Sequence, residues 1–73
     1  MIGTFKSDDY GNVHFQFDDG TWAVANWESF GSGQGGEYNP FDVEGNTKLE
    51  SKEIVKLAYA NTGRPPGRIR QPE

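Results

Sequence analysis

The stretch Val13-His-Phe-Gln-Phe-Asp-Asp-Gly-Thr-Trp-Ala-Val-Ala-Asn-Trp27 decides the fold that the sequence predicts. Residues 13–17 alternate strictly between apolar and polar side chains, which is typical of a strand with one buried face. Residues 21–27 form a second strand pattern, and it follows Asp19-Gly20. This dipeptide favours a hairpin turn because both residues tolerate a positive φ. The stretch therefore predicts two antiparallel strands.

The register of this hairpin depends on the length of its turn. A two-residue turn places Phe17 opposite Trp22. Phe15 then lies opposite Val24, so that the large apolar side chains share one face, while a three-residue turn moves Trp22 to the other face. We prefer the two-residue turn because it gathers the apolar groups under the helix. In this register Trp27 lies on the opposite face from Trp22.

Two further elements complete the predicted fold. Residues 2–6 form a first strand, and residues 47–62 form the one helix. Thr47 and Glu50 have the spacing of a capping box, and Gly63 suits the left-handed position that follows a helix. One face of this helix is expected to pack on the sheet; it carries Ile54, Leu57, Ala58 and Asn61.

Two segments lack a clear pattern. Residues 28–46 include a glycine-rich run and are predicted to be a long loop, either mobile or functional. Tyr38, Phe41 and Val43 form a weak apolar patch around Pro40, which suits a short edge strand or a clamp over the core. In an alternative to an exposed Trp27, residues 37–43 fold over the face away from the helix and bury Trp27 in a second small core. Residues 64–73 are rich in proline and arginine and are predicted to be disordered. The expected fold is therefore α+β over residues 1–63, a three-stranded antiparallel β-meander with one C-terminal α-helix packed on one face, followed by a disordered basic tail.

The composition narrows the class of protein. A chain of 73 residues with 33% hydrophobic content fits one small domain. The sequence contains no cysteine, which excludes disulfides and thiolate metal sites. We find neither a signal-peptide pattern nor an apolar run long enough to span a membrane. These features predict a monomeric cytoplasmic protein.

The charge is divided unevenly along the chain. Residues 1–46 carry one lysine and eight acids, whereas residues 64–73 carry three arginines and one acid. An acidic body repels phosphate backbones and favours encounter with a basic surface on another protein. The same acids could instead serve only to keep a small domain soluble. An acidic mimic of nucleic acid is a further alternative, although the net charge of −4 is small for that role.

The sequence gives little support for catalysis. His14 is the single histidine, lies mid-strand and has no nucleophile motif to accompany it. The pairs Asp8-Asp9 and Asp18-Asp19 lack the spacing of a calcium loop and suit turns instead. The glycine-rich run 31–36 is not followed by the Lys-Ser/Thr of a phosphate-binding loop. We therefore expect no enzyme activity, no metal and no cofactor.

One short stretch suggests nucleic-acid binding. Tyr10-Gly-Asn-Val-His-Phe15 resembles the strand with which cold-shock domains stack aromatic and histidine side chains on bases. The resemblance implies a single-stranded nucleic-acid module that uses His14, Phe15 and Phe17. The neighbouring strand lacks that family's Gly-Phe-Gly-Phe pattern, and the body is acidic. This function is the alternative hypothesis.

The main hypothesis is a protein-binding surface. Tryptophan and tyrosine supply much of the energy at interface hot spots. Trp27 is expected on the sheet face away from the helix, and Tyr10 in an exposed turn. The candidate partner-binding residues are Tyr10, His14, Gln16, Asp18, Asp19 and Trp27, with accessory contacts from the tail residues Arg64, Arg68 and Arg70.

Three features of the whole chain support a resemblance to a known family. They are the run Met1-Ile-Gly-Thr-Phe-Lys-Ser-Asp-Asp-Tyr10, the hairpin Asp19-Gly20-Thr21-Trp22 and the total length. The chain resembles the small antitermination regulators made by lytic bacteriophages. This resemblance implies a non-enzymatic protein that binds the N-terminal segment of the largest (β′) subunit of the host RNA polymerase, with a neighbouring subunit as a secondary contact. Such binding is expected to interfere with sigma-dependent initiation and to let elongating polymerase read through terminators. Nucleic acid is contacted only indirectly, and the resemblance assigns no residue a role.

Overall fold

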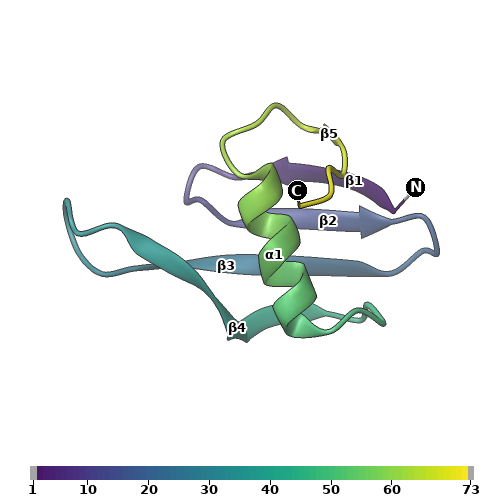
Figure 1. Cartoon of the computed structure of the whole chain (residues 1–73), viewed down its shortest axis with the longest axis horizontal. Helices are drawn as coiled ribbons and strands as arrows, with labels where there is room; N and C mark the ends of the chain where they lie inside the picture. The colour runs from purple at the N-terminus through teal and green to yellow at the C-terminus, as the bar shows by residue number, and fades with distance from the viewer. Residues whose placement is uncertain (1, 73) are drawn as a thin grey trace.

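A computed structural model describes residues 2–72, in which five antiparallel strands form one sheet and a single helix covers one face of it (Figure 1). The strands follow the order β4-β3-β2-β1-β5 across the sheet. The α+β class is confirmed, and the sheet has two more strands than predicted. The elements are β1 (Gly3–Ser7), β2 (Val13–Phe17), β3 (Trp22–Ser29), β4 (Gly36–Gly45), α1 (Ser51–Asn61) and β5 (Gly67–Arg68).

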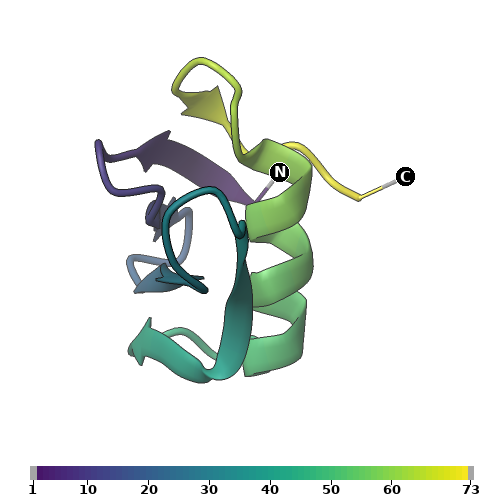
Figure 2. The same cartoon turned by 90° about the vertical axis from the view of Figure 1, so that its left-hand side faces the viewer.

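The hydrophobic core lies between α1 and the sheet, as the side view in Figure 2 shows. Alternate residues of β1 and β2 point toward the helix and are buried, among them Phe5, Phe15 and Phe17. The predicted helix face is confirmed, because its members are buried against the sheet. They are Ile54, Leu57, Ala58 and Asn61.

The predicted register between β2 and β3 is wrong by one residue. The backbone N–H of Phe17 donates to the carbonyl of Thr21 at 2.8 Å, so the turn between them has three residues. Ala23 and Ala25 therefore face the helix and are fully buried, and Trp22 lies on the other face. Small side chains at these two positions let the bulky residues of α1 approach the sheet closely, which outweighs the gathering of large groups on one face.

Residues 28–46 form a hairpin and not the long loop predicted. β3 continues to Ser29 and β4 spans Gly36–Gly45, so only residues 30–35 connect them. Trp27 pairs with Tyr38 whereas Ala25 pairs with Val43, so residues 39–42 of β4 bulge opposite one residue of β3. This arm projects beyond the rest of the sheet in Figure 1.

The C-terminal tail is docked, and the prediction of disorder is wrong for residues 64–72. β5 pairs with β1, and the N–H of Ile69 donates to the carbonyl of Gly3 at 2.8 Å. Ile69 is buried in the core. Asn61 of α1 donates to the carbonyl of Arg70 and accepts from its N–H, both at 2.8 Å. The tail is therefore part of the fold.

The helix is shorter than predicted. It begins at Ser51, and the Thr47 hydroxyl accepts from the N–H of Leu49 without capping the helix. The expected capping box is therefore absent. Gly63 follows the helix with a φ of +73°, which confirms the left-handed position predicted for it.

Candidate protein-binding surface

The face of the sheet opposite α1 has no helix packed on it, and we call it the open face. Strand residues that alternate with the buried ones point to it. A shallow depression of about 290 Å³ lies near its centre, where Lys6, His14 and Gln16 meet Trp22 and Val24. Further residues of the open face are Thr4, Glu28, Glu37 and Glu44.

The two tryptophans lie on opposite faces, but in the reverse of the predicted arrangement. Trp22 is on the open face and is 40% exposed. Trp27 packs against the core, with its ring centroid 5.0 Å from that of Tyr38 in an edge-to-face contact. The prediction that Trp27 is an exposed anchor on the open face is therefore wrong. The alternative, in which residues 37–43 bury Trp27 in a second small core on the face away from the helix, differs from the structure as well, because Tyr38 contacts Trp27 on the helix side.

Asp8 organises the turn between β1 and β2. Its carboxylate accepts hydrogen bonds from the N–H groups of Tyr10 and Asn12, and His14 Nε2 lies 2.9 Å from its Oδ2. Burial raises the pKa of Asp8, but the hydrogen bonds, led by that of His14, outweigh this effect and lower the pKa to about 2. The carboxylate is therefore ionised at neutral pH and holds the imidazole against the turn.

Tyr10 stands at the tip of this turn. It is 81% exposed, which agrees with its predicted exposure. The turn is tied to the sheet, because Asn12 Oδ1 accepts from the N–H of Trp27 at 2.8 Å. The structure thus presents Tyr10 on a fixed base at one end of the sheet.

Asp18 and Asp19 lie in the turn between β2 and β3, at the other end of the sheet from Tyr10. Asp18 accepts two hydrogen bonds from the Arg68 guanidinium, and these lower the pKa of the Asp18 carboxyl. Asp19 accepts from the N–H and the hydroxyl of Thr21, which lowers the pKa of its carboxyl as well. Both acids therefore have partners within the chain.

The six predicted partner-binding residues do not form one patch. His14 and Gln16 lie on the open face, and Trp27 lies on the helix side. Tyr10 and the aspartate turn are separated by the length of β2. The structure replaces Trp27 with Trp22 as the aromatic residue of the open face.

The sequence shows that residues 1–46 are acidic, but not that several of the acids gather on the β3–β4 arm, because the strand pattern of this segment is irregular. Glu28 lies directly opposite Glu37, an arrangement in which like charges repel. Residues 22–45 contain no lysine or arginine to balance them. Phe41, in the bulge of β4, is 99% exposed. We call the set of Glu28, Glu37, Phe41, Asp42 and Glu44 the acidic edge.

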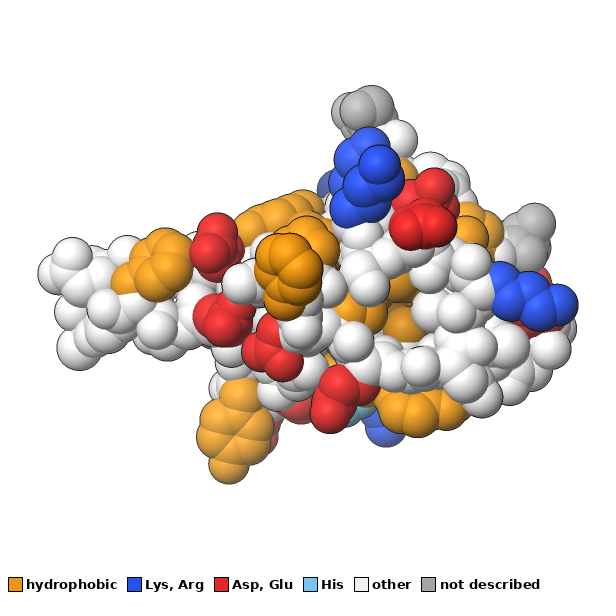
Figure 3. Space-filling model, turned by 90° about the horizontal axis from the view of Figure 1, so that it is seen from below, with side chains coloured by type: hydrophobic (Ala, Val, Ile, Leu, Met, Phe, Trp, Pro, Cys, Tyr) orange, Lys and Arg blue, Asp and Glu red, His pale blue; other side chains and the backbone are white. Residues whose placement is uncertain are grey.

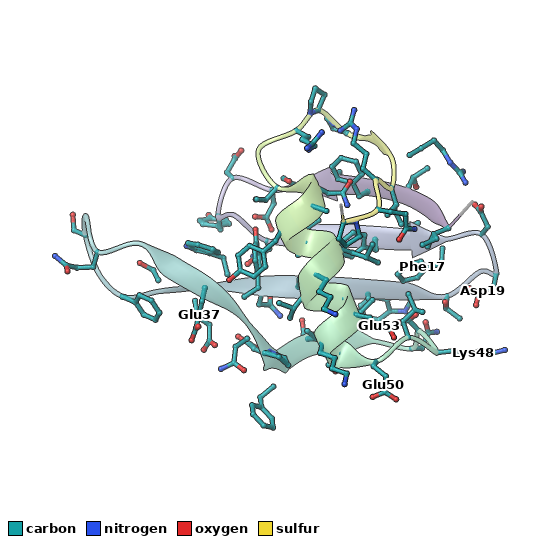
Figure 4. All side chains as sticks on the ribbon, viewed as in Figure 1. Phe17, Asp19, Glu37, Lys48, Glu50 and Glu53 are labelled. Atoms are coloured by element: carbon teal, nitrogen blue, oxygen red, sulfur yellow. The ribbon has the colours of Figure 1, made fainter. Side chains whose placement is uncertain are left out.

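The surroundings of the acidic edge are visible from the β4 side. Figure 3 shows several Asp and Glu side chains gathered around exposed hydrophobic groups in this view. Figure 4 shows Glu37 toward the arm and Asp19 and Lys48 at the other end of the sheet. The acidic edge is therefore a separate area from the aspartate turn.

The three tail arginines have different surroundings. Arg68 is paired with Asp18, whereas the Arg70 guanidinium carbon lies 6.0 Å from the centre of the Phe5 ring. Arg64 is exposed after the end of α1. The three arginines predicted as accessory contacts therefore do not form one group.

Within residues 2–72, no three His, Asp or Glu side chains are grouped so that they could hold a metal ion. None of the helical segments in this range is long and apolar enough to cross a membrane.

No model of a known protein family, no curated protein and no solved structure matches the chain.

Proposed function

We propose that this chain is a non-enzymatic regulator that binds bacterial RNA polymerase in the cytoplasm of a phage-infected host. Its partner is the N-terminal segment of the β′ subunit, with a neighbouring subunit as a secondary contact. Binding inhibits sigma-dependent initiation and prevents termination of transcription. The choice of polymerase rests on the resemblance to phage antitermination regulators, and the open face supports a protein partner.

The exposed Trp22, which lines the depression of the open face, is the observation that carries this proposal. A large aromatic side chain on a strand, with no helix above it, exposes apolar area that a partner can bury. Its neighbours His14 and Gln16 supply polar groups around it. An apolar centre with a polar rim is the usual arrangement of a protein interface.

The charge on the same face favours a basic partner. Glu28, Glu37 and Glu44 lie on the β3–β4 side of the open face. A lysine or arginine from a partner placed between Glu28 and Glu37 would relieve their repulsion. The face therefore fits a segment that has an apolar side chain and adjacent basic residues.

The cold-shock-like alternative receives no support from this face. Phe15 and Phe17 are 1% and 8% exposed and lie in the core under α1. They are therefore not available to stack on bases. Of the residues assigned to base stacking, only His14 is on the open face, and Asp8 holds its ring.

A pull-down from bacterial lysate with the tagged protein, with and without nuclease, tests the partner. We expect RNA polymerase subunits in near-stoichiometric amounts under both conditions. Failure to recover polymerase would overturn the choice of partner. Recovery that depends on nucleic acid would overturn direct protein binding.

Binding of purified polymerase to variants tests the surface. Trp22→Ala should weaken binding by about 2 kcal/mol or more, roughly 30-fold, with little change in melting temperature. Phe30→Ala is the matched control, because Phe30 is also an exposed aromatic residue, at 60%, but lies beyond the end of β3 opposite to Trp22 and does not line the depression. Equal affinity of Trp22→Ala and the wild type would exclude the open face as the interface.

A further inference from the structure

A second depression, of about 410 Å³, lies between α1 and the docked tail. Figures 1 and 2 show the chain returning alongside the helix after β5. We call this depression the basic pocket, because three of its lining residues are cationic and none is acidic. It is lined by Lys56, Tyr59, Ala60, Arg64, Arg70, Gln71 and Pro72.

The walls of the basic pocket are fixed by contacts within the fold. Asn61 is fully buried and holds the backbone of Arg70 with two hydrogen bonds of 2.8 Å. The Arg70 guanidinium carbon is placed 6.0 Å from the centre of the Phe5 ring. The tail side of the pocket is therefore preorganised.

Tyr59 gives the helix side of the pocket an aromatic surface. Its hydroxyl accepts a hydrogen bond from the N–H of Tyr38 at 3.1 Å, and the two rings make an edge-to-face contact with centroids 5.0 Å apart. These contacts hold the ring in place, yet half of Tyr59 remains exposed. The exposed side of the ring is available to a planar group.

The cations of the basic pocket are not used in ion pairs within residues 2–72. The pairs in that range are His14 with Asp8 and Arg68 with Asp18. Lys56, Arg64 and Arg70 take part in neither. Three cations around one depression, on a chain with a net charge of −4, form a local site for an anion.

We propose that the basic pocket binds single-stranded nucleic acid. Lys56, Arg64 and Arg70 hold the phosphate backbone, and a base stacks on Tyr59. Proteins that bind single strands without sequence preference combine cations along the phosphate backbone with an aromatic ring on which any base can stack. The ring favours this ligand over an acidic peptide, which has charge but no base to stack. This site is separate from the open face and does not depend on the proposed protein partner.

Fluorescence anisotropy with a labelled ten-nucleotide uridine RNA, from 50 mM salt upward, tests the proposal. Three phosphate contacts predict that the logarithm of the association constant falls with the logarithm of salt concentration with a slope of about −2. Arg64→Ala should weaken binding and reduce this slope by about 0.7. Lys48→Ala is the matched control, since it removes an exposed cation outside the pocket.

Tyr59 variants separate stacking from charge. Tyr59→Leu should weaken binding about tenfold and leave the salt slope unchanged. Tyr59→Phe keeps the ring and should retain the affinity of the wild type. The melting temperature of each variant shows whether the fold is intact.

Three results would overturn the proposal. The first is absence of RNA binding by the wild-type protein at 50 mM salt. The second is a loss in Lys48→Ala equal to that in Arg64→Ala, which would indicate charge attraction without a site. The third is displacement of the RNA by a ten-residue polyglutamate as effectively as by unlabelled RNA.

Discussion

The two edges of the sheet differ in length, charge and support. The β5 edge has two residues and is secured by the buried Ile69 and by Asn61. The β4 edge has ten residues, a bulge and a fully exposed Phe41. Cations gather near the first edge, and acids gather along the second.

This difference shows how a small sheet can limit pairing with other sheets at both of its edges. An unpaired edge strand is a template for aggregation unless it is short, charged or irregular. β5 is short, whereas β4 has Pro40 in its bulge and acids along its length. The opposite charges of the two edges also separate the surface proposed for a basic protein segment from the pocket proposed for phosphate.

Removing the anchor of the β5 edge should have the largest effect on stability. Asn61→Ala leaves the N–H and the carbonyl of Arg70 and the carbonyl of Leu57 without their present partner. We expect the free energy of unfolding to fall by about 2–4 kcal/mol, as measured by urea denaturation. This is most of the stability that a domain of this size usually has. A loss below about 1 kcal/mol would show that tail docking contributes little.

A glycine in each edge strand gives a matched comparison. A Cβ added to Gly36 of β4 lies 2.7 Å from the Trp27 ring, whereas one added to Gly67 of β5 has no atom within 4 Å. Gly36→Ala should therefore lower the free energy of unfolding by about 1–3 kcal/mol. Gly67→Ala should leave it nearly unchanged. Equal effects of the two substitutions on urea denaturation would contradict the close packing of the β4 edge.

The turn between β1 and β2 lies away from both edges, and its stability should depend on pH. The folded-state pKa of Asp8 is about 2, below its ordinary value of 3.8. The ionised Asp8 carboxylate therefore stabilises the fold fully above about pH 4, and this stabilisation is lost as the pH falls toward 2. Asp8→Asn should cost about 1–2 kcal/mol at neutral pH.

Urea denaturation from pH 2 to pH 5 measures this effect. The stability of Asp8→Asn should fall less steeply with decreasing pH than that of the wild type. The stability of Asp8→Asn will still depend on pH to some extent, because the pKa values of Asp18 and Asp19 are also lowered in the folded state. Asp9→Asn removes the same charge from the same turn and serves as the control. Identical pH profiles for Asp8→Asn and the wild type would contradict the hydrogen-bonded carboxylate.

The exposed ion pair that joins the β5 edge to the neighbouring turn should have the smallest effect. Arg68 and Asp18 both have side chains that are nearly half exposed. Water and salt screen such a pair, so Arg68→Ala should lower the melting temperature only slightly, and less in high salt. A decrease in melting temperature as large as that for Asn61→Ala would show that this pair secures the β5 edge as strongly as Asn61 does.

The sequence predicted the parts of the fold that have a regular period. The alternation in residues 13–17 gave β2, and the spacing of Ile54, Leu57 and Ala58 gave the buried helix face. The full extent of β4 was not predicted, because its bulge places the helix-facing Tyr38 and Val43 out of alternation. The tail was missed because its one apolar anchor, Ile69, lies among prolines, glycines and arginines.

The candidate site could also be predicted only where the sequence pattern is regular. His14 and Gln16 alternate with buried residues, so their face could be assigned from the pattern, and Tyr10 was expected to be exposed in its turn. The sheet faces of Trp22 and Trp27 could not be assigned correctly. They depend on the register between β2 and β3, and the buried alanines of β3 determine that register. An alanine buried under a helix carries little hydrophobic signal in the sequence, although its small size decides which strand pairing fits.

The pairing of β1 with β5 has a consequence for how the chain opens. Thr4 pairs with Arg68, so this contact closes a loop that contains nearly the whole chain. By contrast, β1, β2 and β3 are joined by short turns. Long loop closure costs more entropy, and such contacts tend to form late and open first. The amide protons of Ile69 and Arg70 should therefore exchange with solvent faster than those of β2. Each opening uncovers Phe5 and the backbone of β1, which makes β1 the first strand through which the protein would aggregate.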